Sequence, residues 1–188
     1  MHIILTLGDQ LSGSKSLTNQ QVAVTLQAYW QHIRADLETK IILSGGKIND
    51  KVTNAALMED IVRHPKKYNI NAKRIPKCDL ILEEKSTNIC GNILHAVNKI
   101  RKHIDTIKQI SIITIDSYLS QVAKTFGIVS SVYNDSAPDE GAQKYEFPIY
   151  KIIACNTLEE YAETQQVAND VYYTDKFLAE CKNTMINP

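Results

Sequence analysis

The sequence has no excess of charge of either sign, because 21 lysine and arginine residues are balanced by 21 aspartate and glutamate residues. A balanced chain has no net field that draws it to nucleic acid or to an anionic membrane, so such binding would need a local patch. Long apolar runs are also missing, since no stretch approaches the roughly 18 apolar residues that span a bilayer. Met1 leads into an apolar segment without a basic leader. We therefore expect a cytoplasmic protein with no membrane span and no nucleic-acid partner.

Cysteine is scarce, and its spacing excludes two classes of site. No two of the cysteines form a C-x-x-C pair, which a zinc ribbon or a thioredoxin-like redox motif would need. Free cysteine packs as a small hydrophobic residue, so we expect reduced and mostly buried thiols. The cysteines are Cys78, Cys90, Cys155 and Cys181.

Motifs that specify a reaction are missing as well. The chain contains no Gly-x-Ser-x-Gly elbow, no H-E-x-x-H pair, no P-loop and no complete G-x-G-x-x-G fingerprint. Its histidines fall at the start of a strand, at helix ends, before a proline or deep in a helix, where they reach no common site easily. They are His2, His32, His103, His64 and His95. The sequence therefore assigns no catalytic residue and no metal ligand.

What the sequence does contain is an alternation of short apolar runs with amphipathic segments of ten or more residues. The expected strands are 2–7, 40–44, 79–84, 110–115, 128–133 and 145–154, and the expected helices are 18–33, 52–63, 86–103, 117–127 and 157–181. This alternation is typical of a parallel sheet with helices on both faces. The length suits one domain, so we expect a single three-layer α/β domain over residues 1–188 with a mostly parallel sheet of five to six strands.

Several residues predict where these elements begin and end. Thr18 opens the first helix in a capping-box pattern, and Ser86 is expected to cap the third. Gly127 suits the end of a short fourth helix, and Pro148 places the last strand at the margin of the sheet, because proline cannot donate to a central ladder. The apolar stripe of the first helix is expected to comprise Val22, Leu26, Tyr29, Trp30 and Ile33.

The segment 40–49 contains the clearest strand end, where an apolar run stops abruptly at Ser44, Gly45 and Gly46. Consecutive glycines can adopt positive φ and bring backbone N–H groups close to a ligand. In open α/β sheets, ligands bind at the carboxyl ends of the strands. The same glycines also suit a plain tight turn, so a structural role stays open.

Polar residues follow the other predicted strands too, and parallel strands bring them to one edge of the sheet. Two helix N-termini, one after the glycines and one at Ser86, are expected to point free backbone donors into this cleft for a phosphate or carboxylate. Glu83 and Asp116 suit acceptance from hydroxyl or amino groups, although Ser86 and Asp116 can also be helix caps. The candidate ligand-binding residues are Gly8, Asp9, Gln10, Ser44, Gly45, Gly46, Glu83, Ser86, Asn88, Asn92, Thr114, Asp116 and Tyr118.

Three ordered motifs resemble the YdcF/SanA/ElyC-like family over residues 2–133. They are the run Ile-Ile-Leu-Ser-Gly-Gly at 41–46, Glu83-x-x-Ser86-x-Asn88-x-x-x-Asn92, and Ile112-Ile113-Thr114-x-Asp116-x-Tyr118. The resemblance implies a Rossmann-like α/β fold with a polar pocket at the strand ends. It also implies S-adenosylmethionine as a possible ligand and bacterial envelope metabolism as a setting, in a family whose reaction is largely undefined.

The chain departs from the family pattern at charged positions. Ile89 and Gly91 occupy positions where the family commonly has Thr and Glu. Tyr118 and Gln121 occupy positions where it has His and Arg. Gln21 replaces a family arginine, and Asn54 replaces an acidic residue. Loss of Arg and His removes bidentate anion binding and a general acid or base. A strongly anionic substrate at this edge is therefore disfavoured.

These observations lead to one main hypothesis and two alternatives. The main hypothesis is a small-molecule-binding protein whose pocket takes a nucleoside-like or zwitterionic metabolite such as S-adenosylmethionine, with a possible reaction that the sequence does not define. The first alternative is a catalytically degenerate module for binding or interaction. The second is a metal-assisted hydrolase that uses Asp9, Glu83 or Asp116, which lack a recognisable ligand spacing.

Overall fold

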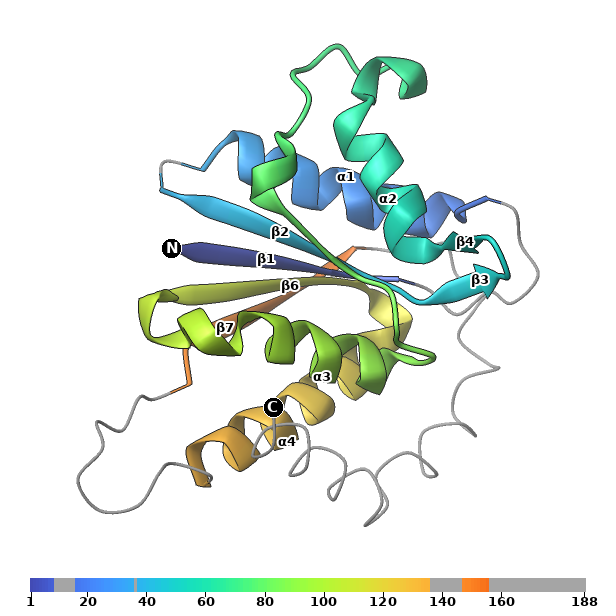
Figure 1. Cartoon of the computed structure of the whole chain (residues 1–188). Helices are drawn as coiled ribbons and strands as arrows, with labels where there is room; N and C mark the ends of the chain where they lie inside the picture. The colour runs from blue at the N-terminus through green and yellow to red at the C-terminus, as the bar shows by residue number, and fades with distance from the viewer. Residues whose placement is uncertain (9–15, 36, 136–146, 156–188) are drawn as a thin grey trace.

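The computed structural model describes residues 1–8, 16–35, 37–135 and 147–155, and it shows a parallel β-sheet between two layers of helices (Figure 1). The strands of this sheet are β1 (His2–Leu7), β2 (Thr39–Ser44), β5 (Leu80–Glu83), β6 (Gln109–Ile115) and β7 (Ile149–Cys155). The α-helices of the described residues are α1 (Asn19–Ile33), α2 (Asn54–Arg63), α3 (Ile89–Ile100) and α4 (Leu119–Asp135). The predicted Rossmann-like three-layer α/β fold is confirmed.

The sheet has the strand order β5-β2-β1-β6-β7, and every neighbouring pair is parallel. The chain therefore starts in the middle, moves outward through β2 to β5, and then crosses back to β6 and β7 on the other side of β1. All the carboxyl ends lie at one edge, as the sequence predicts. The direction of the strand order reverses between β1 and β6, and this is the position where doubly wound sheets bind their ligands.

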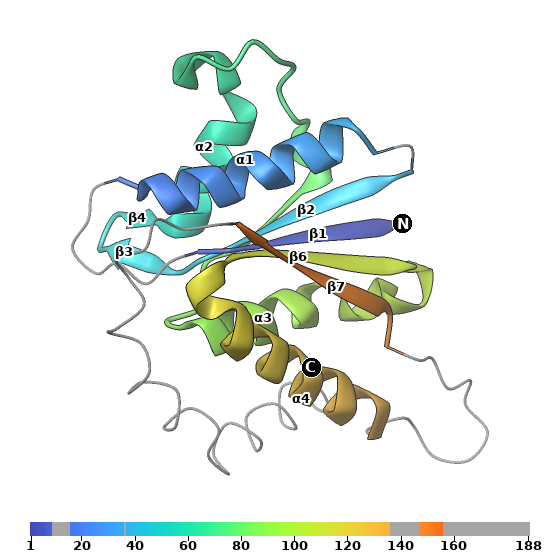
Figure 2. The same cartoon turned by 180° about the vertical axis from the view of Figure 1, so that it is seen from behind.

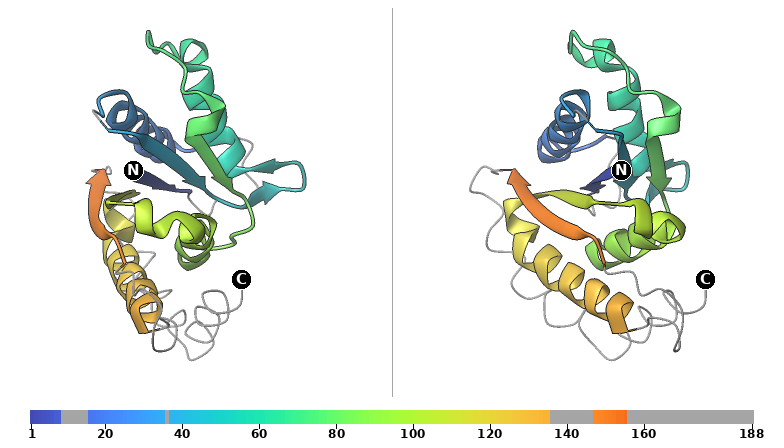
Figure 3. Two further views of the ribbon diagram at one scale, coloured as in Figure 1. Left: turned by 60° about the vertical axis from the view of Figure 1, so that its left-hand side comes forward. Right: turned by 90° about the vertical axis from the view of Figure 1, so that its left-hand side faces the viewer.

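The two faces of the sheet are covered by different pairs of helices, as Figure 2 and Figure 3 show. Helices α1 and α2 pack against one face, where Ile4 and Ile41 are fully buried, whereas α3 and α4 pack against the other, where Ile3 and Ile42 are fully buried. Alternate residues of one strand thus enter opposite cores, because side chains in a strand alternate between faces. A strand buried on both faces reads as a continuous apolar run.

The predicted fifth strand at 128–133 is wrong, because these residues belong to α4. Val122, Phe126, Val129 and Val132 are buried at helical spacing against the core beneath α3. Their tertiary packing outweighs the β-propensity of the run Ile-Val-Ser-Ser-Val-Tyr. The predicted helix end at Gly127 is wrong for the same reason, since the helix continues through it. The predicted marginal position of the last strand is confirmed, because β7 is an edge strand that begins directly after Pro148.

A short hairpin that the sequence analysis did not predict separates the glycine turn from α2. Its strands β3 (Lys47–Asn49) and β4 (Val52–Thr53) pair antiparallel around a turn in which Asn49 Oδ1 accepts from the backbone N–H groups of Lys51 and Val52. An Asn-Asp pair between β-branched residues is a recognisable turn signal. Helix α2 therefore begins at Asn54, two residues later than predicted, with Thr53 as its N-cap.

Two other helix predictions have mixed outcomes. Thr18 caps α1 as expected, since its hydroxyl accepts from Gln21 N at 3.1 Å. The predicted stripe of α1 is wrong in part, because Trp30 and Ile33 are 37% and 41% exposed while Val24 and Ala28 form the buried face. Helix α3 is capped by Asn88 and not by the predicted Ser86. No helix among the described residues is long and apolar enough to cross a bilayer, and the predicted helix at 157–181 lies outside them.

Candidate functional site

The glycines at the ends of β1 and β2 allow three backbone segments to meet at the carboxyl edge. A Cβ atom on Gly46 would overlap the backbone carbonyl of Ser86, and one on Gly45 would lie 2.5 Å from the Cβ of Asn54. Gly8 N donates to Ser44 O at 2.5 Å, and Gly45 N donates to Glu83 O at 2.9 Å. Glycine is thus required here for close approach of protein to protein.

The expected free donors at the start of α2 are not free, and this prediction is wrong. Asn54 N donates to Gly46 O at 2.9 Å, and Ala55 N donates to Gly45 O at 3.0 Å. Ala56 N donates to the hydroxyl of Thr53 at 3.1 Å. The glycine turn itself and the helix cap therefore satisfy the donors that an anion would otherwise use.

Glu83 stands at the centre of this edge, where it is fully buried. Its Oε1 accepts from Lys85 N at 2.7 Å and from Ser86 N at 3.1 Å, and its Oε2 lies 2.7 Å from the hydroxyl of Ser44. A buried carboxylate requires such partners, because an unpaired one is costly to remove from water. Its oxygens are thus engaged with the protein itself rather than exposed to a ligand.

Asn92 ties the same network to the end of β1. Its Nδ2 donates to Gly8 O at 3.0 Å, and its Oδ1 accepts from the hydroxyl of Ser86. Asn92 and Ser86 are almost fully buried. Asn88 instead accepts from Gly91 N at 2.7 Å as the cap of α3. The structure therefore brings these predicted residues together, but as an interlocked polar layer that joins three strand ends and one helix.

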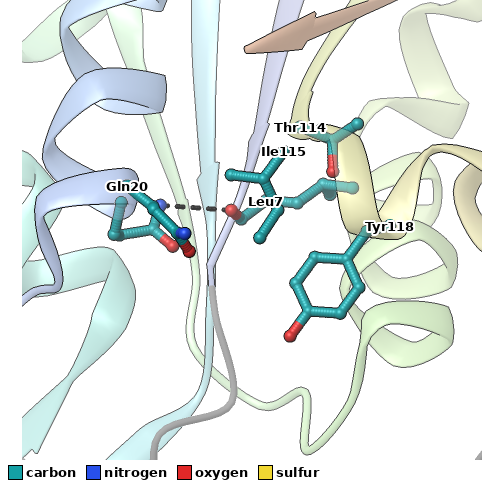
Figure 4. Close-up of a pocket in the computed structure, with 6 residues that line it drawn as sticks. Leu7, Gln20, Thr114, Ile115 and Tyr118 are labelled. Carbon is teal, nitrogen blue, oxygen red and sulfur yellow. Dashed lines mark hydrogen bonds between the residues drawn. The ribbon is translucent and has the colours of Figure 1, made fainter. Parts of the chain in front are cut away.

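A separate crevice lies beside this layer, at the switch point between β1 and β6 (Figure 4). Its volume is about 10 Å³, which holds roughly one water molecule. Two predicted residues, Thr114 and Tyr118, contribute to it. The lining comprises Leu7, Gln20, Gln21, Thr114, Ile115 and Tyr118.

The chemistry of the crevice is polar and uncharged. Amide groups come from the first turn of α1, hydroxyl groups from the end of β6 and the turn after it, and apolar walls from Leu7 and Ile115. Gln21 is buried, and its Nε2 donates to Leu7 O at 3.1 Å (Figure 4). Figure 4 shows Gln20 and Tyr118 on opposite sides of Leu7. No charged side chain stands among these described lining residues.

Sequence reasoning did not select Gln20, Gln21, Leu7 and Ile115 as site residues. Gln21 is the last residue of the capping-box pattern at Thr18 and replaces a family arginine, and its place two residues into a capped helix after β1 is the signal that points to a site residue. Asp9 and Gln10 lie outside the described residues, and the side chain of Asp116 is not described. The structure therefore does not place these three predicted side chains.

The two histidines with shifted pKa values lie at the amino ends of the strands, opposite the carboxyl edge. His2, at the start of β1, has a lowered pKa because of burial, then of Lys151 and the N-terminal amino group, and its Nε2 lies 2.8 Å from the hydroxyl of Ser111. Burial also lowers the pKa of His32, against the opposing effect of Asp79. Within the described residues, no group of three His, Cys, Asp or Glu side chains could hold a metal ion.

Comparison with known proteins adds no relative to this picture. The chain matches no protein-family model, no curated protein and no solved structure. The candidate site is thus defined by its own geometry: an uncharged crevice at the switch point, beside a buried polar layer that holds the strand ends together.

Proposed function

We propose that the protein binds a nucleoside-like metabolite in the β1/β6 crevice. The observation that carries this proposal is the position of a polar, uncharged crevice at the point where the strand order reverses, which is where sheets of this kind bind nucleotides and related ligands. Two strand ends and the start of α1 meet there. This arrangement allows backbone and side chains from three elements to contact one ligand.

The described lining favours the nucleoside part of a ligand over a charged part. Gln20 and Gln21 carry amides that pair with the edge of a base, while Thr114 and Tyr118 carry hydroxyls that pair with a ribose. Leu7 and Ile115 supply apolar surface for the flat base. S-adenosylmethionine fits this scheme through its adenosine, and its charged end would extend beyond the described lining.

The crevice must open to admit such a ligand, because about 10 Å³ holds only water. Gln20 and Tyr118 are half-buried and flank the opening, whereas Gln21 and Thr114 are buried. Of these two side chains, Gln20 is the one whose rotation enlarges the site without disturbing the core, because Tyr118 is packed against both hydrophobic clusters. Rotamer changes of side chains at the surface take picoseconds to nanoseconds.

Isothermal titration with adenosine and with S-adenosylmethionine tests the proposal directly. We expect both to bind, and we expect Tyr118→Phe to weaken binding by about fivefold through loss of one hydroxyl contact. Tyr150→Phe is the matched control, because it removes a hydroxyl from the aromatic cluster around Phe126, away from the crevice. Absence of heat with both ligands, or equal effects of the two substitutions, would contradict the proposal.

A further inference from the structure

A second cavity lies where α2 ends, away from the carboxyl edge of the sheet. It is lined by the end of α2, by the 3₁₀ helix η1 (Pro65–Tyr68) and by residues 71–74 of the segment that returns towards β5, here called the returning segment. These segments lie at the top of Figure 1. Its volume is about 620 Å³, within the range of about 300 to 1,000 Å³ that small-molecule sites occupy. Its lining includes six basic side chains, Arg63, His64, Lys66, Lys67, Lys73 and Arg74, and no acidic one.

This concentration of charge contrasts with the neutral chain around it. Residues 59–74 contain five lysines and arginines against two carboxylates, so the segment carries a net charge of three positive units. Glu59 pairs with Arg63 at 3.3 Å, and Asp60 pairs with Lys67 at 2.5 Å. Both carboxylates thus pair with cations of α2 and η1, and neither forms an ion pair with Lys73 or Arg74.

The remaining cations have no counter-ion among the described residues. Lys66, Lys73 and Arg74 form no ion pair or side-chain hydrogen bond there, and Nε of Arg63 is buried without a hydrogen-bond partner. The helix dipole accounts for cations in the last turn of α2. It does not account for Lys73 and Arg74, which arrive from a different segment.

The backbone that presents these cations is anchored to the core from both sides. Ile75 is fully buried, and its N–H donates to Val62 O at 3.1 Å. Tyr29 of α1 donates its hydroxyl to Lys73 O at 2.5 Å, and Ile70 N donates to Pro65 O at 3.0 Å. A fixed backbone lowers the cost of ordering the site when a ligand binds.

We propose that this cavity binds a small molecule that carries a diphosphate or triphosphate group. Cations that converge on one cavity from two segments suit a ligand with at least two negative charges, and the combination of arginine forks with lysine point charges suits phosphate oxygens. The cations surround one open cavity of about 620 Å³, which favours a small ligand over a nucleic acid, because a nucleic acid needs an extended basic stripe. The site is separate from the crevice, so each proposal stands or fails alone.

Titration of the full chain with pyrophosphate and with adenosine triphosphate tests this proposal, at about 50 and 200 mM salt so that screening is visible. We expect both probes to bind, more weakly at the higher salt. Lys73→Ala combined with Arg74→Ala should weaken pyrophosphate binding by about tenfold or more, and Lys66→Ala from the facing segment should weaken it as well. Adenosine should not displace pyrophosphate.

The matched control is Lys99→Ala combined with Lys102→Ala, which removes the same charge from exposed positions near the end of α3. It should leave pyrophosphate binding within about twofold, since distant exposed charges are screened. Three outcomes would overturn the proposal: absence of heat with both probes, equal weakening by the two double variants, or tighter binding of a single-stranded RNA oligonucleotide that displaces adenosine triphosphate.

Discussion

The carboxyl edge of the sheet and the basic cavity treat polar groups in opposite ways. At the edge, Glu83, Ser86 and Asn92 are buried, and each is hydrogen-bonded to a neighbouring strand end or helix. At the cavity, Lys73 and Arg74 are exposed and unpaired within the described residues. The residues at the edge make hydrogen bonds that hold the fold together, whereas the side chains of Lys73 and Arg74 make no such contacts among the described residues.

The contrast shows that a polar residue at an expected ligand edge is not by itself a ligand contact. Parallel strand ends expose carbonyl and N–H groups that the fold must satisfy, and buried side chains near them are recruited for that task. Exposed cations such as Lys73 and Arg74 are satisfied by water, so the fold does not depend on pairing them. The comparison therefore predicts large stability effects at the edge and small ones at the cavity.

The largest effect is expected from Gly46→Ala. Its new Cβ would overlap the backbone of Ser86, so we expect a loss of more than about 3 kcal/mol in the free energy of unfolding, measured by urea denaturation. Gly127→Ala is the control, because nothing lies within 4 Å of the added methyl group and the position is inside α4. It should raise stability by about 0.5 to 1 kcal/mol. Similar losses of stability from both substitutions would contradict the inference that the backbone of Ser86 leaves no room for a side chain at Gly46.

The next effect is expected at Glu83. Glu83→Ala leaves the N–H groups of Lys85 and Ser86 without their acceptor, so we expect a loss of about 2 to 4 kcal/mol. Glu83→Gln keeps an acceptor and should lose about 1 kcal/mol. The exposed neighbour Glu84 is the control, and Glu84→Ala should change stability by less than about 1 kcal/mol. A negligible change in the free energy of unfolding for Glu83→Ala would show that its buried hydrogen bonds matter no more to stability than the exposed, unpaired cations do.

A smaller, pH-dependent effect is expected at Asp60, which links α2 to the cavity rim. A hydrogen bond from Lys67 and others from Tyr68 and His64 lower its pKa from 3.8 to about 2. A depressed pKa in the folded state gives stability above pH 4 that is lost as the pH falls from about 4 to 2. Because these groups are largely exposed, Asp60→Asn should cost less than about 1 kcal/mol at pH 6.

The measurement is urea denaturation of the wild type and Asp60→Asn at several pH values between 6 and 3. The difference between the two proteins should shrink towards pH 3, because Asp60 of the unfolded chain takes up a proton below about pH 4, whereas the folded carboxylate stays ionised down to about pH 2. High salt should also reduce the difference. A difference that stays constant with pH would mean that the ion pair with Lys67 contributes nothing to folding.

The smallest effect on stability is expected from Lys73→Ala combined with Arg74→Ala. Their side chains have no partner to lose among the described residues, so the free energy of unfolding should change by less than about 0.5 kcal/mol. Removal of unpaired positive charge could even raise it slightly, since like charges repel. A loss of unfolding free energy comparable to that of Glu83→Ala would mean that Lys73 and Arg74 stabilise the fold rather than serve a ligand site.

Much of the fold could be predicted from the sequence, because its strands are continuous apolar runs. The run 40–44 agrees within one residue with β2 (Thr39–Ser44), and 110–115 agrees equally well with β6 (Gln109–Ile115). The segment 128–133 could not be assigned in this way. A short run of six residues in which three are β-branched satisfies both periodicities, and only its packing against α3 and the sheet selects the helix.

The candidate site was harder to predict, since its two parts look alike in the sequence. Ser86 and Tyr118 both follow predicted strands, yet one is buried in the polar layer and the other lines the crevice. Gln20 belongs to no motif, and the capping-box pattern that ends at Gln21 predicts a helix start rather than a ligand contact. The cations of the basic cavity are split between 63–67 and 73–74, so their convergence depends on the turn at Asn69, which has a φ of 59°.

Local sequence patterns are enough to predict the alternation of strands and helices and the common edge of the strand ends, and they contain no motif that names a reaction. These follow from local periodicity and from the direction of parallel crossovers. Which polar residues are hydrogen-bonded within the protein and which face solvent depends instead on tertiary packing. That distinction depends on how closely the glycine turn approaches Ser86 and on where the two basic segments meet, and distances between residues far apart in the chain are set by packing.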